Sequence, residues 1–187
     1  DLTPLSPGDS LEPEPYVVEK FLGAGGEGVT YLVEDRQTKH KMVLKEVILP
    51  SHAGQVMKER SLRNFQNQAR LLSQIDHEGI ARLKEHFVRQ GRAYLVLEYI
   101  EGESLAQLVD ANGPLTARRT AELALAMAGI LEHLHSLKPP VLHRDFTPHN
   151  LIIEPGGKLK LIDFGVALED KDLINQEKAS IDRKSGA

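Results

Sequence analysis

The chain has 187 residues, with 23 Lys and Arg against 27 Asp and Glu and a formal net charge of −4. This mildly acidic balance gives no general attraction to nucleic acid or anionic membranes, and the lack of cysteine excludes disulfides, thiolate zinc sites and a cysteine nucleophile. No apolar run is long enough for a membrane span, and no secretory signal pattern is visible. We therefore expect a soluble cytoplasmic protein. Its first residue, Asp1, suggests a piece of a longer polypeptide.

The first half of the sequence has the pattern of a small sheet with one helix. Prolines in residues 1–15 indicate an extended linker or arm. Five later segments have the β-branched and aromatic residues of short strands: 16–22, 29–34, 41–49, 80–88 and 92–100. Between the third and fourth, apolar residues recur at spacings of three and four along residues 62–75, which predicts a helix.

The second half changes to helices followed by short strands. Ser104 is expected to cap a short helix through residue 109, and Thr116 a longer one to about residue 137. The longer helix is apolar on almost every face, as expected of a helix buried in a core. A hairpin of residues 151–153 and 159–162 follows. The predicted fold is α+β, with two lobes of different character.

Two features of the first half have a weak chemical signal when each is taken alone. Gly23, Gly25 and Gly28 would let the backbone approach a phosphate closely, but an ordinary hairpin turn explains them equally well. A Walker A loop is excluded because no Lys-Ser/Thr pair follows Gly28. Lys45, in the third strand, is by itself typical of a solvated side chain.

Three polar residues of the second half give a stronger signal. Asp145 and Asn150 lie five residues apart, where the carboxylate can accept a hydroxyl proton and the amide oxygen can bind a hard cation. Asp163 ends the hairpin that follows and can hold Mg²⁺. A polar turn would explain either segment alone, but not both in this order.

The ordered set of glycine loop, strand lysine, His-Arg-Asp-(four residues)-Asn and Asp-Phe-Gly resembles the signature of the protein kinase family. From about residue 16 to residue 168 the chain is similar to a bacterial-type Ser/Thr kinase rather than a Tyr kinase. The resemblance implies a bilobal fold with a five-stranded antiparallel N-lobe carrying one helix. The domains would be an arm (1–15), an N-lobe with hinge (16–100) and a mainly helical, partial C-lobe (101–187).

The resemblance also assigns roles to residues, with ATP and Mg²⁺ as cofactors and a protein as substrate. Asp145, Lys45 and Asn150 would be catalytic, and Asn150 and Asp163 would bind Mg²⁺. The implied ATP-binding residues are Gly23, Gly25, Gly28, Val43, Lys45, Leu97, Glu98, Ile100 and Ile152. An internal spine is implied for Leu72, Leu83, His143 and Phe164.

Two departures from the family pattern affect charge. Gln68 stands where the family has the glutamate that pairs with the strand lysine, and a neutral amide gives a weaker partner than a carboxylate. Thr147 stands where Ser/Thr kinases commonly have Lys. Other readings are therefore a pseudokinase that binds nucleotide or acts as a scaffold, and the kinase portion of a peptide-modifying synthetase.

The sequence after the Asp-Phe-Gly motif is short. Residues 166–187 contain no Ala-Pro-Glu-like motif and none of the further helices that the resemblance implies. We therefore expect an incomplete C-lobe, a chain that is inactive by itself, and possible self-association through that lobe.

Overall fold

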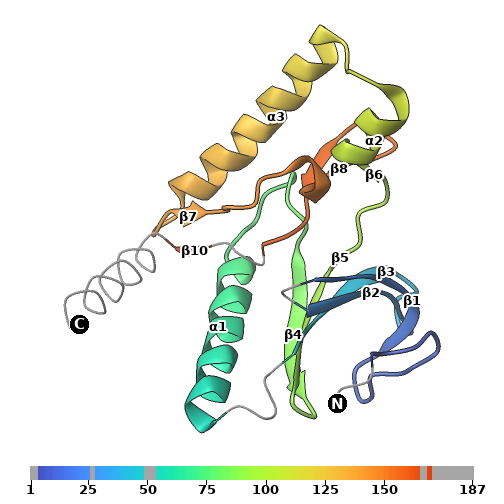
Figure 1. The fold of residues 1–187 in the computed structure, drawn as a ribbon, viewed down its shortest axis with the longest axis vertical. Coiled ribbons are helices and arrows are strands. Elements are labelled where there is room, and N and C mark those ends of the chain that lie inside the picture. Colours follow the sequence, from blue (N-terminus) through green and yellow to red (C-terminus); the bar gives the residue numbers. More distant parts are fainter. Residues whose placement is uncertain (1–3, 26–27, 49–53, 165–167, 170–187) are drawn as a thin grey trace. The chain divides into compact units, whose positions relative to one another are not determined.

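The computed structural model describes residues 4–25, 28–48, 54–164 and 168–169. The chain divides into two compact units, one with residues up to 74 and 81–99 and the other with residues 75–80 and the chain from residue 100. Each unit is described by itself. Sheet and helices together give the predicted α+β class (Figure 1). In the described ranges, no helix has the length and apolarity needed to cross a membrane.

The first unit is built on a five-stranded antiparallel sheet with the order β1-β2-β3-β5-β4. Its strands are β1 (Tyr16–Gly25), β2 (Gly28–Asp35), β3 (Lys41–Ile48), β4 (Leu83–Arg89) and β5 (Arg92–Glu98). All five predicted strands are present. The fourth begins three residues later than predicted because Ile80 forms a parallel bridge with Leu161 in the second unit.

One face of this sheet carries a core rich in aromatic side chains. Its buried members are Leu11, Tyr16, Val18, Tyr31, Val33, Leu44, Tyr94 and Val96, with Phe87 packed against them. Since side chains alternate between the faces of a strand, neighbouring residues lie on the other face. The aromatic face thus takes every second residue of the central strands.

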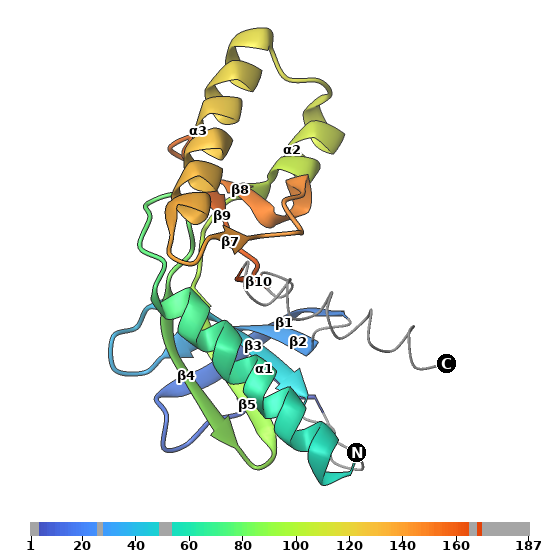
Figure 2. The same ribbon diagram turned by 90° about the vertical axis from the view of Figure 1, so that its left-hand side faces the viewer.

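Helix α1 (Gln55–Ser73) lies across one face of the sheet (Figure 2) and buries Phe65, Ala69, Leu71 and Leu72. The Phe65 ring meets His86 of β4 with 6.1 Å between centroids. The helix begins seven residues before the predicted segment. Its first turns are exposed, with Val56 82% accessible, so no apolar stripe marks them in the sequence.

The proline-rich arm is packed rather than extended away from the sheet. The Gly8 amide donates to the Val18 carbonyl at 2.8 Å, and Leu11 is only 6% exposed. Glu14 forms an ion pair with Arg89 of β4 at 2.9 Å. Apolar residues among the prolines therefore become part of the aromatic core, which composition alone did not indicate.

The described part of the second unit contains two α-helices, one 3₁₀ helix and three short strand pairings. The helices are α2 (Leu105–Asn112), α3 (Ala117–Ser136) and the 3₁₀ helix η1 (Pro148–Asn150). The strands are β6 (Glu103–Ser104), β7 (Val141–Leu142), β8 (Leu151–Ile153), β9 (Leu159–Leu161) and β10 (Leu168–Glu169). Both predicted caps are present: Ser104 accepts from the Gln107 amide in a full capping box, and Thr116 accepts from the Arg119 amide.

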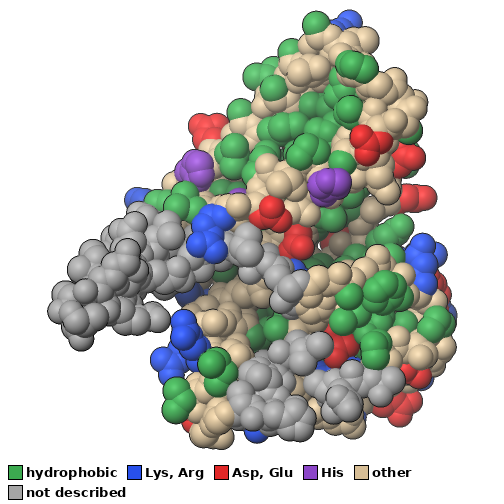
Figure 3. Space-filling view, viewed as in Figure 1, with side chains coloured by type: hydrophobic (Ala, Val, Ile, Leu, Met, Phe, Trp, Pro, Cys, Tyr) green, Lys and Arg blue, Asp and Glu red, His purple; other side chains and the backbone are tan. Residues whose placement is uncertain are grey.

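Helix α3 is apolar on almost every face, as predicted, and its described residues are buried on one side only. Leu123, Ile130 and Leu134 are buried, but Leu125 is 75% exposed. Figure 3 shows hydrophobic side chains gathered over this part of the surface. Much of the apolar character comes from alanine, which favours helix without needing burial.

Candidate active site

The glycine segment joins β1 to β2 in the first unit. Gly23 pairs with Thr30 and Gly25 with Gly28, so both predicted phosphate-binding glycines at 23 and 25 lie within β1. A side chain at either would meet open space. Gly28 is different: its φ is +139°, and a Cβ there would lie 1.9 Å from the Glu46 carbonyl oxygen. Of these three glycines, Gly28 is therefore the one whose position requires glycine, because a side chain there would collide with β3.

Lys45 lies in the middle of β3, paired with Thr30 on one side and Leu95 on the other. Its side chain is only 8% exposed. A buried lysine must have a partner or a ligand for its charge, which is consistent with a phosphate-binding role. Val43, two residues earlier, is half-buried and pairs with Leu97.

The predicted hinge begins at the end of β5. Leu97 is buried, and Glu98 is held by two contacts with Arg82: its amide donates to the Arg82 carbonyl at 2.8 Å, and its Oε2 accepts from the Arg82 amide at 3.2 Å. Ile100, which belongs to the second unit, is 8% exposed. The contacts of Glu98 with Arg82 were not visible in the sequence because the two residues are sixteen positions apart.

The helix position that departs from the family pattern is half-buried. Gln68 lies on α1 one residue before the buried Ala69. Leu72 of the implied spine is buried and Leu83 is half-buried in the same unit. Their assigned roles stay predictions.

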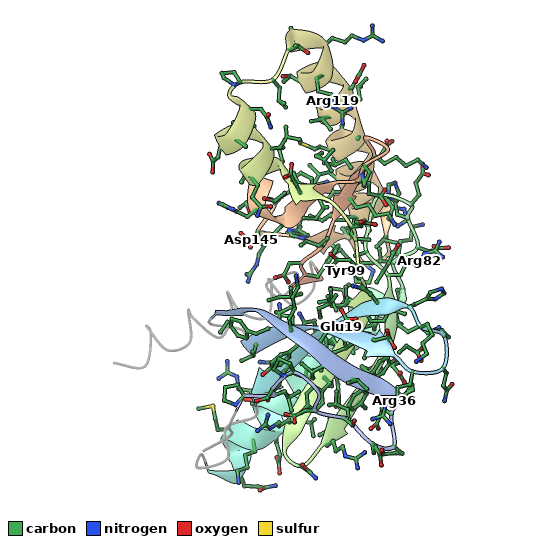
Figure 4. The ribbon with its side chains drawn as sticks, turned by 90° about the vertical axis from the view of Figure 1, so that its right-hand side faces the viewer. Glu19, Arg36, Arg82, Tyr99, Arg119 and Asp145 are labelled. Carbon is green, nitrogen blue, oxygen red and sulfur yellow. The ribbon has the colours of Figure 1, made fainter. Side chains whose placement is uncertain are left out.

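In the second unit the predicted catalytic loop runs from β7 to η1, with Asp145 exposed to solvent near its middle (Figure 4). The Asn150 amide nitrogen donates to the Asp145 backbone carbonyl at 3.0 Å and to the Asp145 carboxylate Oδ2 at 2.8 Å. Both hydrogens of that nitrogen are thereby used, and the amide oxygen is left as an acceptor. Two of the predicted catalytic residues are in direct contact.

His143 is a buried residue of this loop that contacts the loop backbone. It is 3% exposed, its Nδ1 accepts from the Asp145 amide at 3.3 Å, and its ring meets Phe164 edge to face with centroids 4.7 Å apart. Burial lowers the pKa of His143, while the backbone of Asp163 and the nearby carboxylates oppose that effect. A buried, neutral imidazole thus fixes the backbone beside Asp145, and two members of the implied spine touch.

A backbone hydrogen bond joins Asn150 to the residue before Asp163, the other implied metal-binding position. The Ile162 amide donates to the Asn150 carbonyl at 3.0 Å, so Asp163 follows directly after a residue tied to Asn150. Ile152, implied to contact adenine, is half-buried on β8 in the same small sheet. Over the described ranges no group of three His, Asp or Glu side chains forms a metal cluster. One amide and one carboxylate oxygen nevertheless suit Mg²⁺, which keeps several ligand positions for water and phosphate.

Comparison with known proteins identifies the family of this chain. Residues 16–181 match the family model of the protein kinase domain. The chain belongs to the protein kinase family, and three of its relatives are named as Ser/Thr protein kinases. It is 35% identical to the probable serine/threonine-protein kinase YbdM of Bacillus subtilis, over 89% of this chain and 61% of that protein.

The other two relatives are also named as Ser/Thr protein kinases. The chain is 29% identical to the serine/threonine-protein kinase PrkC of Bacillus subtilis, over 81% of this chain and 22% of PrkC. It is 34% identical to the serine/threonine-protein kinase pkn2 of Myxococcus xanthus, over 81% of this chain and 18% of pkn2. The chain thus spans between about a fifth and three fifths of these relatives.

Proposed function

We propose that this protein transfers the γ-phosphoryl group of ATP to Ser or Thr hydroxyls of protein substrates in the cytoplasm, with Mg²⁺ as cofactor. The observation that carries the proposal is the contact of Asn150 with Asp145, together with the backbone bond to the Asn150 carbonyl from Ile162, the residue before Asp163. A proton acceptor and two oxygen ligands then belong to one small, hydrogen-bonded structure.

In this proposal Asp145 orients the acceptor hydroxyl and takes its proton as the phosphoryl group leaves ATP. Asn150 has two tasks: its amide nitrogen holds the Asp145 carboxylate, and its amide oxygen is available to the cation. Bound Mg²⁺ would neutralise charge on the phosphates. Asp163 would supply the charged ligand.

The first unit would bind the nucleotide. Lys45 supplies a positive charge for the α- and β-phosphates, and the segment of Gly23, Gly25 and Gly28 covers them. In the first unit, Val43 would contact adenine, Leu97 would stand at the gatekeeper position and Glu98 would offer a backbone group. The family resemblance assigns adenine contacts to Ile100 and Ile152 as well, which belong to the second unit. Phosphoryl transfer depends mainly on such positioning and charge neutralisation.

Two other functions compete with this one. A pseudokinase would bind nucleotide and signal by its conformation. The presence of Gln68 in place of a glutamate favours this second function. The kinase portion of a peptide-modifying synthetase would use the same site on a different acceptor. The presence of Asp145, Asn150 and Asp163 together favours catalysis, because a scaffold has no chemical need for all three.

Transfer of labelled γ-phosphate separates these functions. Two acceptors are compared, a basic protein and matched peptides whose only hydroxyl is Ser, Thr or Tyr. We expect Mg²⁺-dependent labelling of Ser and Thr in a polypeptide with the remaining helices of the family, and none from these 187 residues alone. Asp145→Asn should reduce the rate by roughly a hundred- to ten-thousandfold.

The control for this experiment is His135→Asn, which changes an exposed residue at the end of α3. ATP binding without Asp145-dependent transfer to any acceptor would favour the pseudokinase. Labelling of peptide precursors but not of proteins would favour the synthetase.

A further inference from the structure

The residue after Lys45 is a buried glutamate on the opposite face of β3. Glu46 is 1% exposed, although carboxylates are seldom buried without a partner. Its Oε1 accepts from Arg92 Nη1 at 2.8 Å, and the two side chains are 2% and 13% exposed. This pair joins the middle of β3 to the first residue of β5.

The pair lies beside the aromatic core of the sheet. Burial raises the pKa of Tyr94 to about 12 and also raises that of Tyr31, and the charge of Glu46 adds to both shifts. The Tyr31 hydroxyl in turn accepts from the Leu5 amide of the arm at 3.0 Å. The second carboxylate oxygen of Glu46 is buried without a hydrogen-bond partner in the described part of the chain. Arg92 therefore supplies the ion-pair partner of the buried charge, which also interacts with the Tyr31 hydroxyl.

The geometry of the ladder connects this pair to Lys45. Glu46 stands opposite Tyr94, and Arg92 stands opposite Ile48, so the ion pair runs diagonally across two ladder positions. A slip of β3 by one residue would exchange the faces of Lys45 and Glu46. A slip by two away from Arg92 would leave Glu46 four ladder positions from it and its buried charge unpaired, whereas a slip by two toward Arg92 would set the two residues directly opposite each other. The buried pair therefore opposes a slip of one residue in either direction and a slip of two away from Arg92.

We propose that the Glu46–Arg92 ion pair is a positioning device for Lys45, which fixes the register of β3 against β5 and so sets where the lysine meets a nucleotide phosphate. The inference rests on the proposed nucleotide-binding function of Lys45. Glu46 and Arg92 do not touch the nucleotide in this account. They act through the strand, and their effect should disappear when Lys45 is removed.

The chain offers a matched control on the same sheet. Glu14 and Arg89 also form an ion pair at 2.9 Å, with side chains 21% and 34% exposed. This second pair joins the arm to β4, which pairs with β5 but not with β3. Its loss should affect the stability of the sheet without altering the position of Lys45.

The test is a double-mutant cycle on the intact chain, with the dissociation constant of Mg·ATP and the thermal midpoint measured for each variant. Glu46→Gln should weaken Mg·ATP binding by roughly three- to tenfold, and Glu14→Gln should leave it unchanged. In a Lys45→Met background, Glu46→Gln should have no further effect on binding. An equal loss in both backgrounds, or an equal loss in Glu14→Gln, would overturn the proposal.

A second variant covers the case in which Glu46→Gln does not fold. Replacing both partners by leucine removes the buried charges together, a change that proteins often tolerate. The folded Glu46→Leu/Arg92→Leu protein should still bind Mg·ATP more weakly than wild type, and unchanged binding would contradict the inference. If Lys45→Met alone binds as wild type does, the proposed nucleotide function fails, and this inference fails with it.

Discussion

The two compact units hold their candidate functional residues by different means. Lys45 belongs to an antiparallel ladder in which β3 pairs with β5 at seven consecutive positions. Asp145 instead lies in a loop between the two-residue strand β7 and the three-residue helix η1. Strand register thus places the lysine, whereas a few local hydrogen bonds place the aspartate.

The difference extends to burial. In the first unit, side chains from the arm and all five strands share one core on the aromatic face. In the second, α3 has twenty residues and buries three of them. In the sheet, many residues together hold a side chain in position. In the loop, a few residues do so, such as Asn150 and His143.

The largest effect on stability should come from a large-to-small substitution in the core of each unit. Leu44 in β3 and Leu134 in α3 are both fully buried. Leu44→Ala and Leu134→Ala should each lower the free energy of unfolding by about 2–5 kcal/mol, as measured by urea titration. Leu125→Ala, at a 75% exposed position of α3, should change it by less than about 0.5 kcal/mol. If Leu134→Ala is as mild as Leu125→Ala, the packed side of α3 is wrongly assigned.

A smaller effect should follow from restoring charge near the lysine. Gln68→Glu gives Lys45 a carboxylate partner, and charge-assisted contacts are about twice as strong as neutral ones. In a polypeptide with the complete helical lobe, phosphotransfer should rise by about five- to thirtyfold, equivalent to roughly 1–2 kcal/mol. A fall in rate would show that Gln68 is adapted to its present neighbours, or that Lys45 has another partner.

The two helix caps of the second unit should each contribute about 1 kcal/mol to the free energy of unfolding. Ser104 forms both halves of a capping box with Gln107, whereas Thr116 accepts one bond. Ser104→Ala should therefore reduce the free energy of unfolding by about 1–2 kcal/mol, and Thr116→Ala by less. Urea titrations of the two variants, with Ser136→Ala as an exposed control at the other end of α3, would measure the order. The reverse order would contradict the capping-box account.

The smallest effect is a pH dependence that originates at His143. Its pKa is lowered in the folded chain by burial, while the unfolded chain has the ordinary value of about 6.5. Below that pH the unfolded state binds the proton first, so this contribution to stability is present above pH 6.5 and is lost as pH falls. His143→Phe should flatten the midpoint between about pH 5 and 7, and the exposed His135→Asn should not. Equal slopes for all three proteins would contradict the prediction.

Local sequence signals were enough for much of the fold. The strands of the first unit, the caps at Ser104 and Thr116 and the Asp145–Asn150 spacing each depend on residues close in the chain. The packing of the arm through Leu11 and the start of the fourth strand depend on contacts distant in sequence, and were not predicted.

The candidate site shows the same division. Motif order indicated which side chains carry the chemistry, and the structure added that Asn150 bonds directly to Asp145. The buried pair of Glu46 with Arg92 joins residues forty-six positions apart. Strand alternation puts Glu46 on the opposite face of β3 from Lys45, but Glu46 was not among the predicted functional residues, and nothing in the sequence identifies its partner.

The most direct test of the account is the dissociation constant of ATP, measured with and without Mg²⁺ for wild type, Lys45→Met and Asp163→Asn. Wild type should bind more tightly with Mg²⁺, Lys45→Met should bind more weakly in both conditions, and Asp163→Asn should lose the gain from Mg²⁺. That pattern would show that Lys45 and Asp163 act on the same bound nucleotide. Identical constants for all three proteins in both conditions would contradict the central claim.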